Sequence, residues 1–588
     1  MADGGWRVAG GGWRVADGGW RMADGGWRMA DGGWRMADGE WRMADGGWQM
    51  ADGEWRMADG EWRMANGGWR MADGSTPGIP LAIHHRPFTL SLTRTDVTGN
   101  TKSMFTATLA APLLNLPLLL VLIPLAGCLI ATRYRYTVAP LGLLCSSLVL
   151  GLVIFTLAGF QPDSLTHRPI HIDAVGIPFI TVTAILTVLL TLYQAVQTGI
   201  HPRRTAALLG LEAVLMGLFT TPNLLVFTLL LTLQLITVGY LLPRRRPEQP
   251  PAGRLYRQFM ASGLLLLWVA TLLLGLHQFQ SGGSWSWELA QLQQNPLPAS
   301  RQGLVFILMF YAAAIHLAQF PLHGWLPELG KKPVTPEFMV MMAGSKVGLY
   351  LLLRFVLPLL PDAVNHFRDF VTGLGLLGIC YGAVLAFTQI GLQRLLAFTL
   401  ISQTGLLLVG VFSLNGRGLT GSLLLSFNAG LASAGLFLTA AALLRRSGTL
   451  LIPRLGRRFN ASPRLAFTGV IAALSTTAIP GTPGFDAVHL LLEGILQAYG
   501  WGMAVAVTSG NILVAGLLLY VFRKIFLTRE RATLPRVEQT QTRWPETVLN
   551  LLIGLSLLAM GFYQQPWMQW IDGSFRHLTA PYQQQPPP

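Results

Sequence analysis

Residues 316–363 read HLAQFPLHGWLPELGKKPVTPEFMVMMAGSKVGLYLLLRFVLPLLPDA, an apolar stretch that is interrupted by prolines and carries one deep lysine, Lys346. The part from Pro336 to Leu359 is long enough to cross a bilayer as a helix, which takes about 20 mainly apolar residues. A charge inside such a helix costs about 2.5–3.5 kcal/mol even on the most lenient insertion scale. The stretch therefore predicts a membrane-spanning helix that keeps a buried charge for a functional reason.

Composition extends this prediction to most of the chain. The chain has 588 residues, of which 52% are hydrophobic and only 12% charged, whereas about 25% are charged in a typical soluble domain. Leu-rich apolar runs recur from about residue 106 to residue 565. Because these runs are continuous rather than alternating, they predict spanning helices. The fold class that follows is an all-α polytopic membrane protein.

About fourteen transmembrane helices are expected, one for each apolar run. The runs lie at residues 107–131, 137–159, 174–198, 205–221, 223–242, 257–278, 303–322, 337–358, 368–388, 394–413, 418–444, 463–482, 498–524 and 547–565. The chemistry of a free-standing enzyme is not indicated. Cys128, Cys145 and Cys380 lie singly in apolar runs, without disulfide or metal-ligand spacing. We expect no metal and no cofactor in this chain.

The loops between the runs alternate in charge. The loops at 160–173, 279–302, 359–367, 414–417 and 483–497 are poor in Lys and Arg. The others carry Arg133 and Arg135, Arg203 and Arg204, Arg244–Arg246 with Arg254 and Arg257, Lys331 and Lys332, Arg394, Arg445 and Arg446 with Arg454, Arg457 and Arg458, and Arg523 to Arg543. By the positive-inside rule the basic loops are cytoplasmic, and both termini lie on the opposite side. The formal charge of +15 is then mostly an orientation signal.

Residues 1–75 form a separate segment that repeats MADGGWR with a period of seven. Its Gly pairs disfavour a helix, and its low complexity predicts disorder. Two alternatives stay open. One is a Trp/Arg arm on the membrane interface, and the other is a translated tandem repeat upstream of a true start at Met104. Residues 76–103 would then be a linker.

Polar side chains inside the apolar runs are candidates for function, because each is costly there. They are Glu212, His316, His323, Lys346, Gln403 and Asn428. A buried lysine can exchange its proton near neutral pH, and a neighbouring carboxylate would favour its charged form. We expect Glu212 to be that carboxylate. The alternatives are that Lys346 snorkels to the surface and that Glu212 only orders two helices.

A second group of candidates follows the proline-rich segment near residue 480. Asp486, His489 and Glu493 are spaced i, i+3, i+7, which places them on one face of a helix. Such a stripe of carboxylate, imidazole and carboxylate could relay protons. The alternative is a solvated stripe at the membrane surface.

Two spans carry helix breakers. Pro321 and Pro327 interrupt the seventh span, and Pro480 and Pro483, each followed by Gly, interrupt the twelfth. Broken helices at membrane depth are tolerated only beside protein or a water-filled cavity. Transporters use them to place polar backbone groups at ion sites. The two breaks are five spans apart, which is the spacing of an internally repeated transporter.

The stretch quoted above resembles the antiporter-like membrane subunits of respiratory complex I, most closely those of the subunit M (chain 4) type, which are related to Mrp antiporter subunits. Further likenesses are CYGAVLAFTQIGLQRLLAFTLISQTGL at 380–406, NAGLASAGLF at 428–437 and PGTPGF at 480–485. The resemblance covers about residues 106–530. It implies fourteen helices with two inverted five-helix repeats, in which helices 7 and 12 are discontinuous.

The resemblance also implies a division of the chain. Residues 104–200 would hold the first three spans, 205–358 and 368–524 the two repeats, 525–546 a cytoplasmic loop, 547–565 the last span and 566–588 a tail. The partners implied are other membrane-arm subunits, the lipid bilayer and protons, without nucleic acid. NADH, FMN, iron–sulfur clusters and quinone would belong to the whole complex rather than to this chain. The location implied is a bacterial inner membrane with periplasmic termini.

The residues that the family uses are only partly present here. Lys346 matches a lysine of the eighth span and Glu212 an acidic position of the fourth. Thr232 stands where the family has a glutamate in the fifth span. His316 stands where it has a lysine in the seventh. The tenth-span histidine is Gln403, and the twelfth-span glutamate falls on Val488, beside His489.

Three functions therefore remain open. The first is a divergent subunit of an NADH:quinone oxidoreductase-type complex that takes part in proton translocation, its path running through the residues named above. The second is a structural subunit of the membrane arm that no longer pumps. The third is a subunit of a related assembly, such as an Mrp-type antiporter, a hydrogenase or a bicarbonate-accumulating complex. In all three the chain itself is a non-catalytic subunit.

Overall fold

The computed structural model describes residues 116–133, 138–159, 175–196, 202–242, 252–331, 335–455, 463–527, 544–562, 578–579 and 581–582, and the backbone of ten strands between residues 6 and 71. The chain divides into two compact units, Met1–Thr98 and Gly99–Pro588. The expected linker at 76–103, the start at Met104, most of the loop at 525–546 and most of the tail at 566–588 lie outside the described residues.

The first unit is a sheet of ten antiparallel strands in sequence order. The strands are β1 (Trp6–Ala9), β2 (Gly12–Val15), β3 (Trp20–Ala23), β4 (Gly26–Met29), β5 (Trp34–Ala37), β6 (Glu40–Met43), β7 (Trp48–Ala51), β8 (Glu54–Met57), β9 (Trp62–Ala65) and β10 (Gly68–Met71). The sequence predicts disorder for residues 1–75, and the structure differs from that prediction.

The physical reason lies in the residues between the paired strands. Ala23 pairs with Gly26 and Ala65 with Gly68, so each of these hairpins leaves two residues for its turn. Those residues are Asp24-Gly25 and Asn66-Gly67. Asp-Gly and Asn-Gly are the strongest short-range signals for a two-residue hairpin. The glycines that argue against a helix therefore favour a meander.

The second unit is helical. Its elements are α2 (Leu116–Arg133), α3 (Val138–Gly159), α4 (Gly176–Val196), α5 (Pro202–Thr220), α6 (Leu224–Leu241), α7 (Ala252–Gly282), α8 (Leu289–Gln294), α9 (Ala299–His316), α10 (Trp325–Leu329), α11 (Pro336–Gly344), α12 (Val347–Leu351), η1 (Leu352–Val356), α13 (Leu357–Leu359), α14 (Pro361–Phe387), α15 (Leu392–Val411), α16 (Gly416–Ser447), η2 (Ile452–Arg454), α17 (Pro463–Thr476), α18 (Pro483–Phe522), η3 (Arg523–Leu527) and α19 (Trp544–Phe562). Every one of the fourteen expected runs overlaps a helix.

The composition of these helices confirms an all-α integral membrane fold. Nine helices among the described residues are long and apolar enough to cross a bilayer, and three shorter apolar helices accompany them. Large apolar side chains stand on the outside of the unit, for example Leu265, Phe370 and Ile512, each more than 60% exposed. Such a surface is suited to lipid or to a neighbouring subunit.

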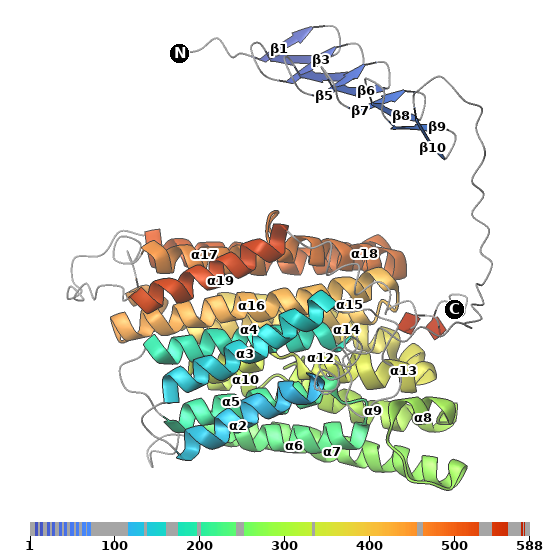
Figure 1. Ribbon diagram of the computed structural model, residues 1–588, viewed down its shortest axis with the longest axis vertical. Helices are drawn as coiled ribbons and strands as arrows, with labels where there is room; N and C mark the ends of the chain where they lie inside the picture. Colours follow the sequence, from blue (N-terminus) through green and yellow to red (C-terminus); the bar gives the residue numbers. More distant parts are fainter. Residues whose placement is uncertain are drawn as a thin grey trace, which may run out of the picture. The chain divides into compact units, whose positions relative to one another are not determined.

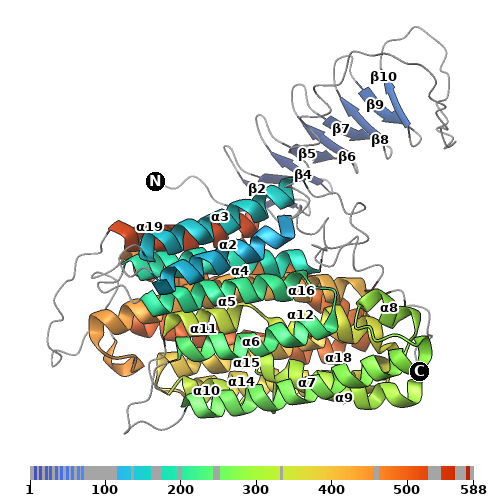
Figure 2. The same ribbon diagram turned by 60° about the horizontal axis from the view of Figure 1, so that its bottom comes forward.

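The helices of this unit lie side by side, with α6 and α7 at one edge and α17 and α19 at the opposite edge (Figure 1). Figure 2 shows the same bundle turned, with α5, α11, α12 and α16 in its middle. α11 packs on α4 and α16, while α12 packs on α9. The elements around Lys346 thus lie in the core of the bundle.

The seventh and twelfth spans end their first halves in the same way. α9 ends at His316, and Ala318 takes a left-handed conformation (φ 52°); α17 ends at Thr476, and Ala478 does the same (φ 58°). In each case the left-handed residue donates to the carbonyl three residues back, and the next residue to the carbonyl five back. This is the Schellman pattern of a helix C-terminus. The matching caps reveal an internal repeat in the local geometry.

The segment between the twelfth and thirteenth spans differs from the expectation. Residues 483–497 are expected to be a loop, but α18 begins at Pro483 and continues through them. Gly500 (φ 76°, ψ −174°) interrupts this helix. Before it, Gly494 packs on Gly418; after it, Gly510 packs on Ile379. The second half of span 12 is therefore helical, because proline at the first helical position starts a helix rather than breaking it.

Candidate functional site

Lys346 lies at a third break, inside the eighth span. It separates α11 from α12 in a left-handed conformation (φ 46°) and is only 4% exposed. Two glycines let other helices approach this break closely. A Cβ added to Gly348 would lie 2.3 Å from the Ala313 carbonyl oxygen, and one added to Gly344 would lie 2.2 Å from Leu186. The lysine is thus held inside the bundle, against α9 and α4.

The expected pairing of Lys346 with Glu212 is not found. Within the described part of the chain, no ion pair involves Lys346. Glu212 is fully buried on α5, beside Thr187 of α4 and Cys145 of α3, and neither of its carboxylate oxygens has a hydrogen-bond partner among the described residues. The helix that carries Glu212 turns its carboxylate toward α3 and α4 instead.

His316 and His323 flank the break in the seventh span. The His316 Nδ1 donates to the Ala312 carbonyl oxygen (2.9 Å), which leaves Nε2 free to accept a proton. His323 is 8% exposed and packs against Tyr381 of α14 with ring centroids 4.8 Å apart. Pro321 lies between the two histidines, and Pro327 lies inside the short helix α10. Both imidazoles therefore belong to the break, although they face different neighbours.

Side chains of this break donate to one carbonyl group at the end of α9 and to one in α14. The Trp325 indole donates to the Ile315 carbonyl oxygen (3.0 Å) and the Gln319 amide to the Leu374 carbonyl oxygen (3.1 Å). Gly378 makes the second contact feasible, because a Cβ there would lie 2.7 Å from the Gln319 nitrogen. Such capping satisfies backbone groups that lipid could not.

Gln403 and Asn428 converge on the matching break in the twelfth span. The Asn428 amide donates to the Ser475 carbonyl oxygen (3.0 Å), and the Ser475 hydroxyl donates back to Asn428 Oδ1. The Gln403 amide donates to the Thr476 carbonyl oxygen (3.4 Å) and to Asn511 Oδ1 (3.3 Å). Spans 10, 11 and 13 thus hold the broken end of α17, while Pro480 lies in the gap and Pro483 opens α18.

The likeness to known proteins agrees with this geometry. Residues 221–513 match the family model described as NADH:quinone oxidoreductase/Mrp antiporter, transmembrane. The helical unit belongs to this family. The NAD(P)H-quinone oxidoreductase chain 4 2 of Thermosynechococcus vestitus is 29% identical over 411 residues, which cover 68% of this chain and 76% of the relative. The NADH-quinone oxidoreductase subunit M of Escherichia coli K12 is 29% identical over 317 residues, 54% of this chain and 62% of the relative.

Solved structures give the same result. A chain of respiratory complex I from Thermus thermophilus superposes with a TM-score of 0.68 at 26% identity, covering 79% of this chain and 99% of that one. A chain of the Mrp complex from Dietzia shares the fold with a TM-score of 0.67 at 20% identity, over 79% of this chain and 97% of that one. The expected complex I antiporter-like fold is confirmed.

Membership of the family gives weight to the positions where this chain departs from the expected pattern. Thr232, which stands where a glutamate is expected, donates to the Thr228 carbonyl oxygen (2.9 Å) and accepts from the Trp268 indole (3.3 Å). It offers no charge to its surroundings. The polar side chains that remain at the expected positions, called the polar axis from here on, are Lys346, His316, Gln403 and Asn428.

The stripe formed by Asp486, His489 and Glu493 does not face this axis. The His489 side chain is 65% exposed and lies 3.4 Å from Glu493, which also pairs with Arg417 (3.1 Å). Ala487, Val488 and Leu491 face inward instead. The spacing correctly places the three polar residues on one helix face, but that face is the outer one.

Sequence reasoning missed another buried carboxylate. Glu337 lies in the first turn of α11 and is 1% exposed, hydrogen-bonded by the Gln194 amide (3.2 Å). Its position directly after Pro336, in the first turn of a span, is the only signal in the sequence. An acidic residue at such a position usually indicates a solvated helix start, which is why Glu337 was missed. No group of three or more potential metal ligands occurs among the described residues.

Proposed function

We propose that this chain is a membrane-arm subunit of an NADH:quinone oxidoreductase-type complex and takes part in proton translocation coupled to electron transfer to quinone. The relatives named for such complexes support this, as does the likeness to a chain of respiratory complex I. NADH, FMN, iron–sulfur clusters and quinone would be held by other subunits. This chain would contribute a path for protons and no cofactor of its own.

One observation carries the proposal: Lys346 is buried between α9, the first half of a broken span, and α16. α12, which follows Lys346, packs on α9. On the other side, a Cβ added to Gly344 would lie 3.6 Å from the Gly430 Cα of α16, two residues after Asn428. A charged group there costs free energy, so its presence favours a role in transport. Its neighbour α9 offers His316, an imidazole that can take and return protons near neutral pH.

The proposal includes a location and an orientation. The chain would lie in a bacterial inner membrane beside other membrane-arm subunits, with the basic loops in the cytoplasm and both termini in the periplasm. Arg204 and Arg445 support this orientation, because both line one cavity, so the start of α5 and the end of α16 lie at the same end of the bundle. Accessibility labelling of a cysteine placed at Arg204 in sealed vesicles would test it.

A structural role without pumping is the second candidate. It is favoured by Thr232, which carries no charge, and by the absence of any ion pair to Lys346 among the described residues. An Mrp-type antiporter subunit, or a subunit of a hydrogenase or a bicarbonate-accumulating complex, is a third candidate. The chain of the Mrp complex supports it through the fold alone.

The test replaces Lys346 by Ala in the assembled complex and measures protons translocated per electron pair in sealed vesicles. We expect the proton yield to fall while quinone reduction without a membrane potential is retained. Lys331→Ala is the matched control, because Lys331 is 49% exposed and pairs with Glu328 (2.6 Å) at the surface. An unchanged yield in a fully assembled Lys346→Ala complex would contradict the pumping role and favour the structural one.

A further inference from the structure

Glu337 is a buried carboxylate that lies outside the expected polar axis. It stands in the first turn of α11, and its Oε1 accepts one hydrogen bond from the Gln194 amide at 3.2 Å. Its Oε2 has no hydrogen-bond partner among the described residues. A buried polar atom without a hydrogen-bond partner is costly, so this oxygen is a site for a bound water.

A chain of polar side chains leads inward from Glu337. The Thr205 hydroxyl of α5 donates to Gln194 Oε1 at 2.8 Å. Thr191, one turn earlier on α4, shares a hydrogen bond with Ser146 of α3 at 2.9 Å. Gly142 lies between these two pairs: a Cβ added there would lie 2.7 Å from the Thr205 methyl group and 3.6 Å from the Thr191 methyl group, so the pairs are neighbours that no direct hydrogen bond links among the described residues.

Glu212 lies at the inner end of this chain. It is fully buried, and both of its carboxylate oxygens lack partners among the described residues. Thr187, one turn from Thr191 on the same face of α4, lies beside it, and Cys145 next to Ser146 lies near it. We call Glu337, Gln194, Thr205, Thr191, Ser146, Thr187 and Glu212 the polar seam. Its side chains lie between two buried carboxylates on α3, α4, α5 and α11, and water would have to bridge the gaps between them, because the Ser146, Thr187 and Thr191 hydroxyls also donate to carbonyl groups of their own helices.

A cavity of about 120 Å³ adjoins the outer end of the seam. Tyr193, Arg204, Pro336, Gln393 and Arg445 line it, so it borders on the residues next to Gln194, Thr205 and Glu337. A water molecule takes about 30 Å³ of liquid, which leaves room for several. The two arginines place the cavity at the end of the bundle that carries the basic loops.

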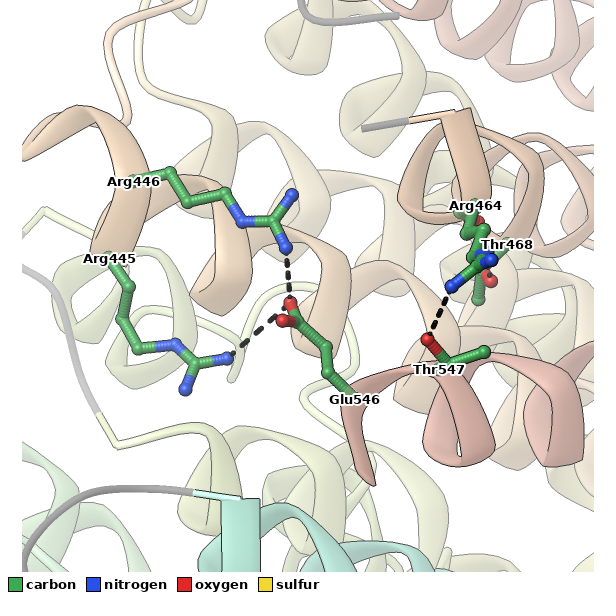
Figure 3. A network of polar contacts seen from close by, with 6 residues as sticks. All are labelled: Arg445, Arg446, Arg464, Thr468, Glu546 and Thr547. Carbon is green, nitrogen blue, oxygen red and sulfur yellow. Dashed lines mark hydrogen bonds and ion pairs between the residues drawn. The ribbon is translucent and has the colours of Figure 1, made fainter. Parts of the chain in front are cut away.

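Arg445 is fixed at this cavity by contacts on both sides. Its guanidinium lies over the Tyr193 ring, 5.2 Å from the centroid, and 3.9 Å from Glu546 of α19. Figure 3 shows Arg445 and Arg446 converging on Glu546, with Arg446 at 2.8 Å. Glu546 offsets part of the positive charge beside the cavity.

We propose that Glu337 and Glu212 are the outer and inner proton-binding groups of an uptake route that runs along the polar seam from the arginine-lined cavity into the bundle. The inference rests on the proposed function and adds a route to it that does not pass through Lys346. A proton from cavity water binds the Glu337 carboxylate. Water and the hydroxyls of the seam, each accepting one proton and passing on another, then deliver a proton to the Glu212 carboxylate.

The first experiment compares Glu337→Gln with Glu328→Gln in the assembled complex. Glu328 is a matched control because it is a partly exposed glutamate paired with Lys331. We expect Glu337→Gln to lower the protons translocated per electron pair to the same extent as Lys346→Ala, and Glu328→Gln to leave the yield unchanged. A normal yield in Glu337→Gln, together with a lowered yield in Lys346→Ala, overturns the seam and leaves the proposed function standing. Normal yields in both overturn both.

A second variant keeps the test decisive if Glu337→Gln does not assemble. Thr205→Val keeps both carboxylates and the volume of the side chain but removes the hydroxyl that bonds Gln194. We expect a lowered proton yield with quinone reduction retained, and a normal yield overturns the seam as a route. Infrared titration of the purified complex adds a readout apart from pumping. A carboxylic-acid band should titrate in the native protein and weaken in Glu212→Gln, whereas an unchanged spectrum contradicts proton binding at Glu212.

Discussion

Asn428 illustrates how single residues make a broken helix tolerable inside a membrane. α17 ends at Thr476, and its last carbonyl groups have no partner within the helix. Asn428, 1% exposed on α16, supplies both a donor and an acceptor to Ser475. Gly484 leaves room for this pair, since a Cβ there would lie 2.1 Å from the Ser475 carbonyl oxygen. The break is therefore a fixed structure with satisfied groups.

Replacing Asn428 by Leu should destabilise the protein by about 1–3 kcal/mol, because it leaves the buried Ser475 hydroxyl without its acceptor. The measurement is the thermal unfolding midpoint of the detergent-solubilised complex, followed with a probe on this subunit. Gln293→Leu in α8 is the control, since Gln293 is exposed. Equal midpoints for Asn428→Leu and Gln293→Leu would show that the pair does not hold the break.

At this scale the sequence predicts which residues are unusual but not what surrounds them. Lys346, Glu212, Gln403 and Asn428 stand out because a polar group inside an apolar run is costly. Glu337 does not stand out, since its burial results from Gln194 and the packing of α4 and α16 on α11. The same limit misplaced Asp486 and its neighbours: periodicity defines a helix face, while other helices decide whether that face is covered.

Among the elements, the two half-helices α9 and α17 share one terminal geometry although their sequences differ. Ala318 and Ala478 each occupy the left-handed position where glycine is usual. A side chain there costs about 1 kcal/mol or more. The cost is accepted at both breaks, which indicates that each break requires a defined exit direction rather than a loose hinge.

Ala318→Gly and Ala478→Gly should each stabilise the native protein by about 1 kcal/mol, because glycine adopts positive φ without steric cost. Their effects should add, since the two sites lie in different spans. Ala312→Gly is the control: Ala312 lies inside α9, where glycine costs about 1 kcal/mol. The check is the same thermal midpoint, and a loss of stability in both loop variants would contradict the left-handed assignment.

How far elements could be predicted depended on local signals. Each apolar run overlaps a helix, because a run of about 20 apolar residues favours a helix that can cross a bilayer. The second half of span 12 was missed because Pro483 was taken as a breaker, although proline also suits the first turn of a helix. The turn at Gly500 could not be predicted from local sequence, because it depends on the packing of Gly494 and Gly510 on different neighbours.

At the scale of the whole molecule, the chain consists of two units, and different interactions stabilise each of them. The helical unit contains the hydrophobic core, with Trp325, Tyr350 and Phe219 among its largest fully buried side chains. The family match, the broken spans and Lys346 all lie within it. The sheet of residues 6–71 is built by a repeated hairpin signal that the family match does not include.

A chain that begins at Met104 should therefore insert, assemble and support proton translocation as the full chain does. The reason is that every described contact of the polar axis and of the seam comes from residues after 116. The measurement compares complex assembly and protons per electron pair for the full and shortened chains. The shortened chain carrying Lys346→Ala is the control, and it should lose pumping as the full-length variant does. Failure of the shortened chain alone to assemble would instead assign the repeat a role in biogenesis, as expected of an arm that contacts the membrane surface.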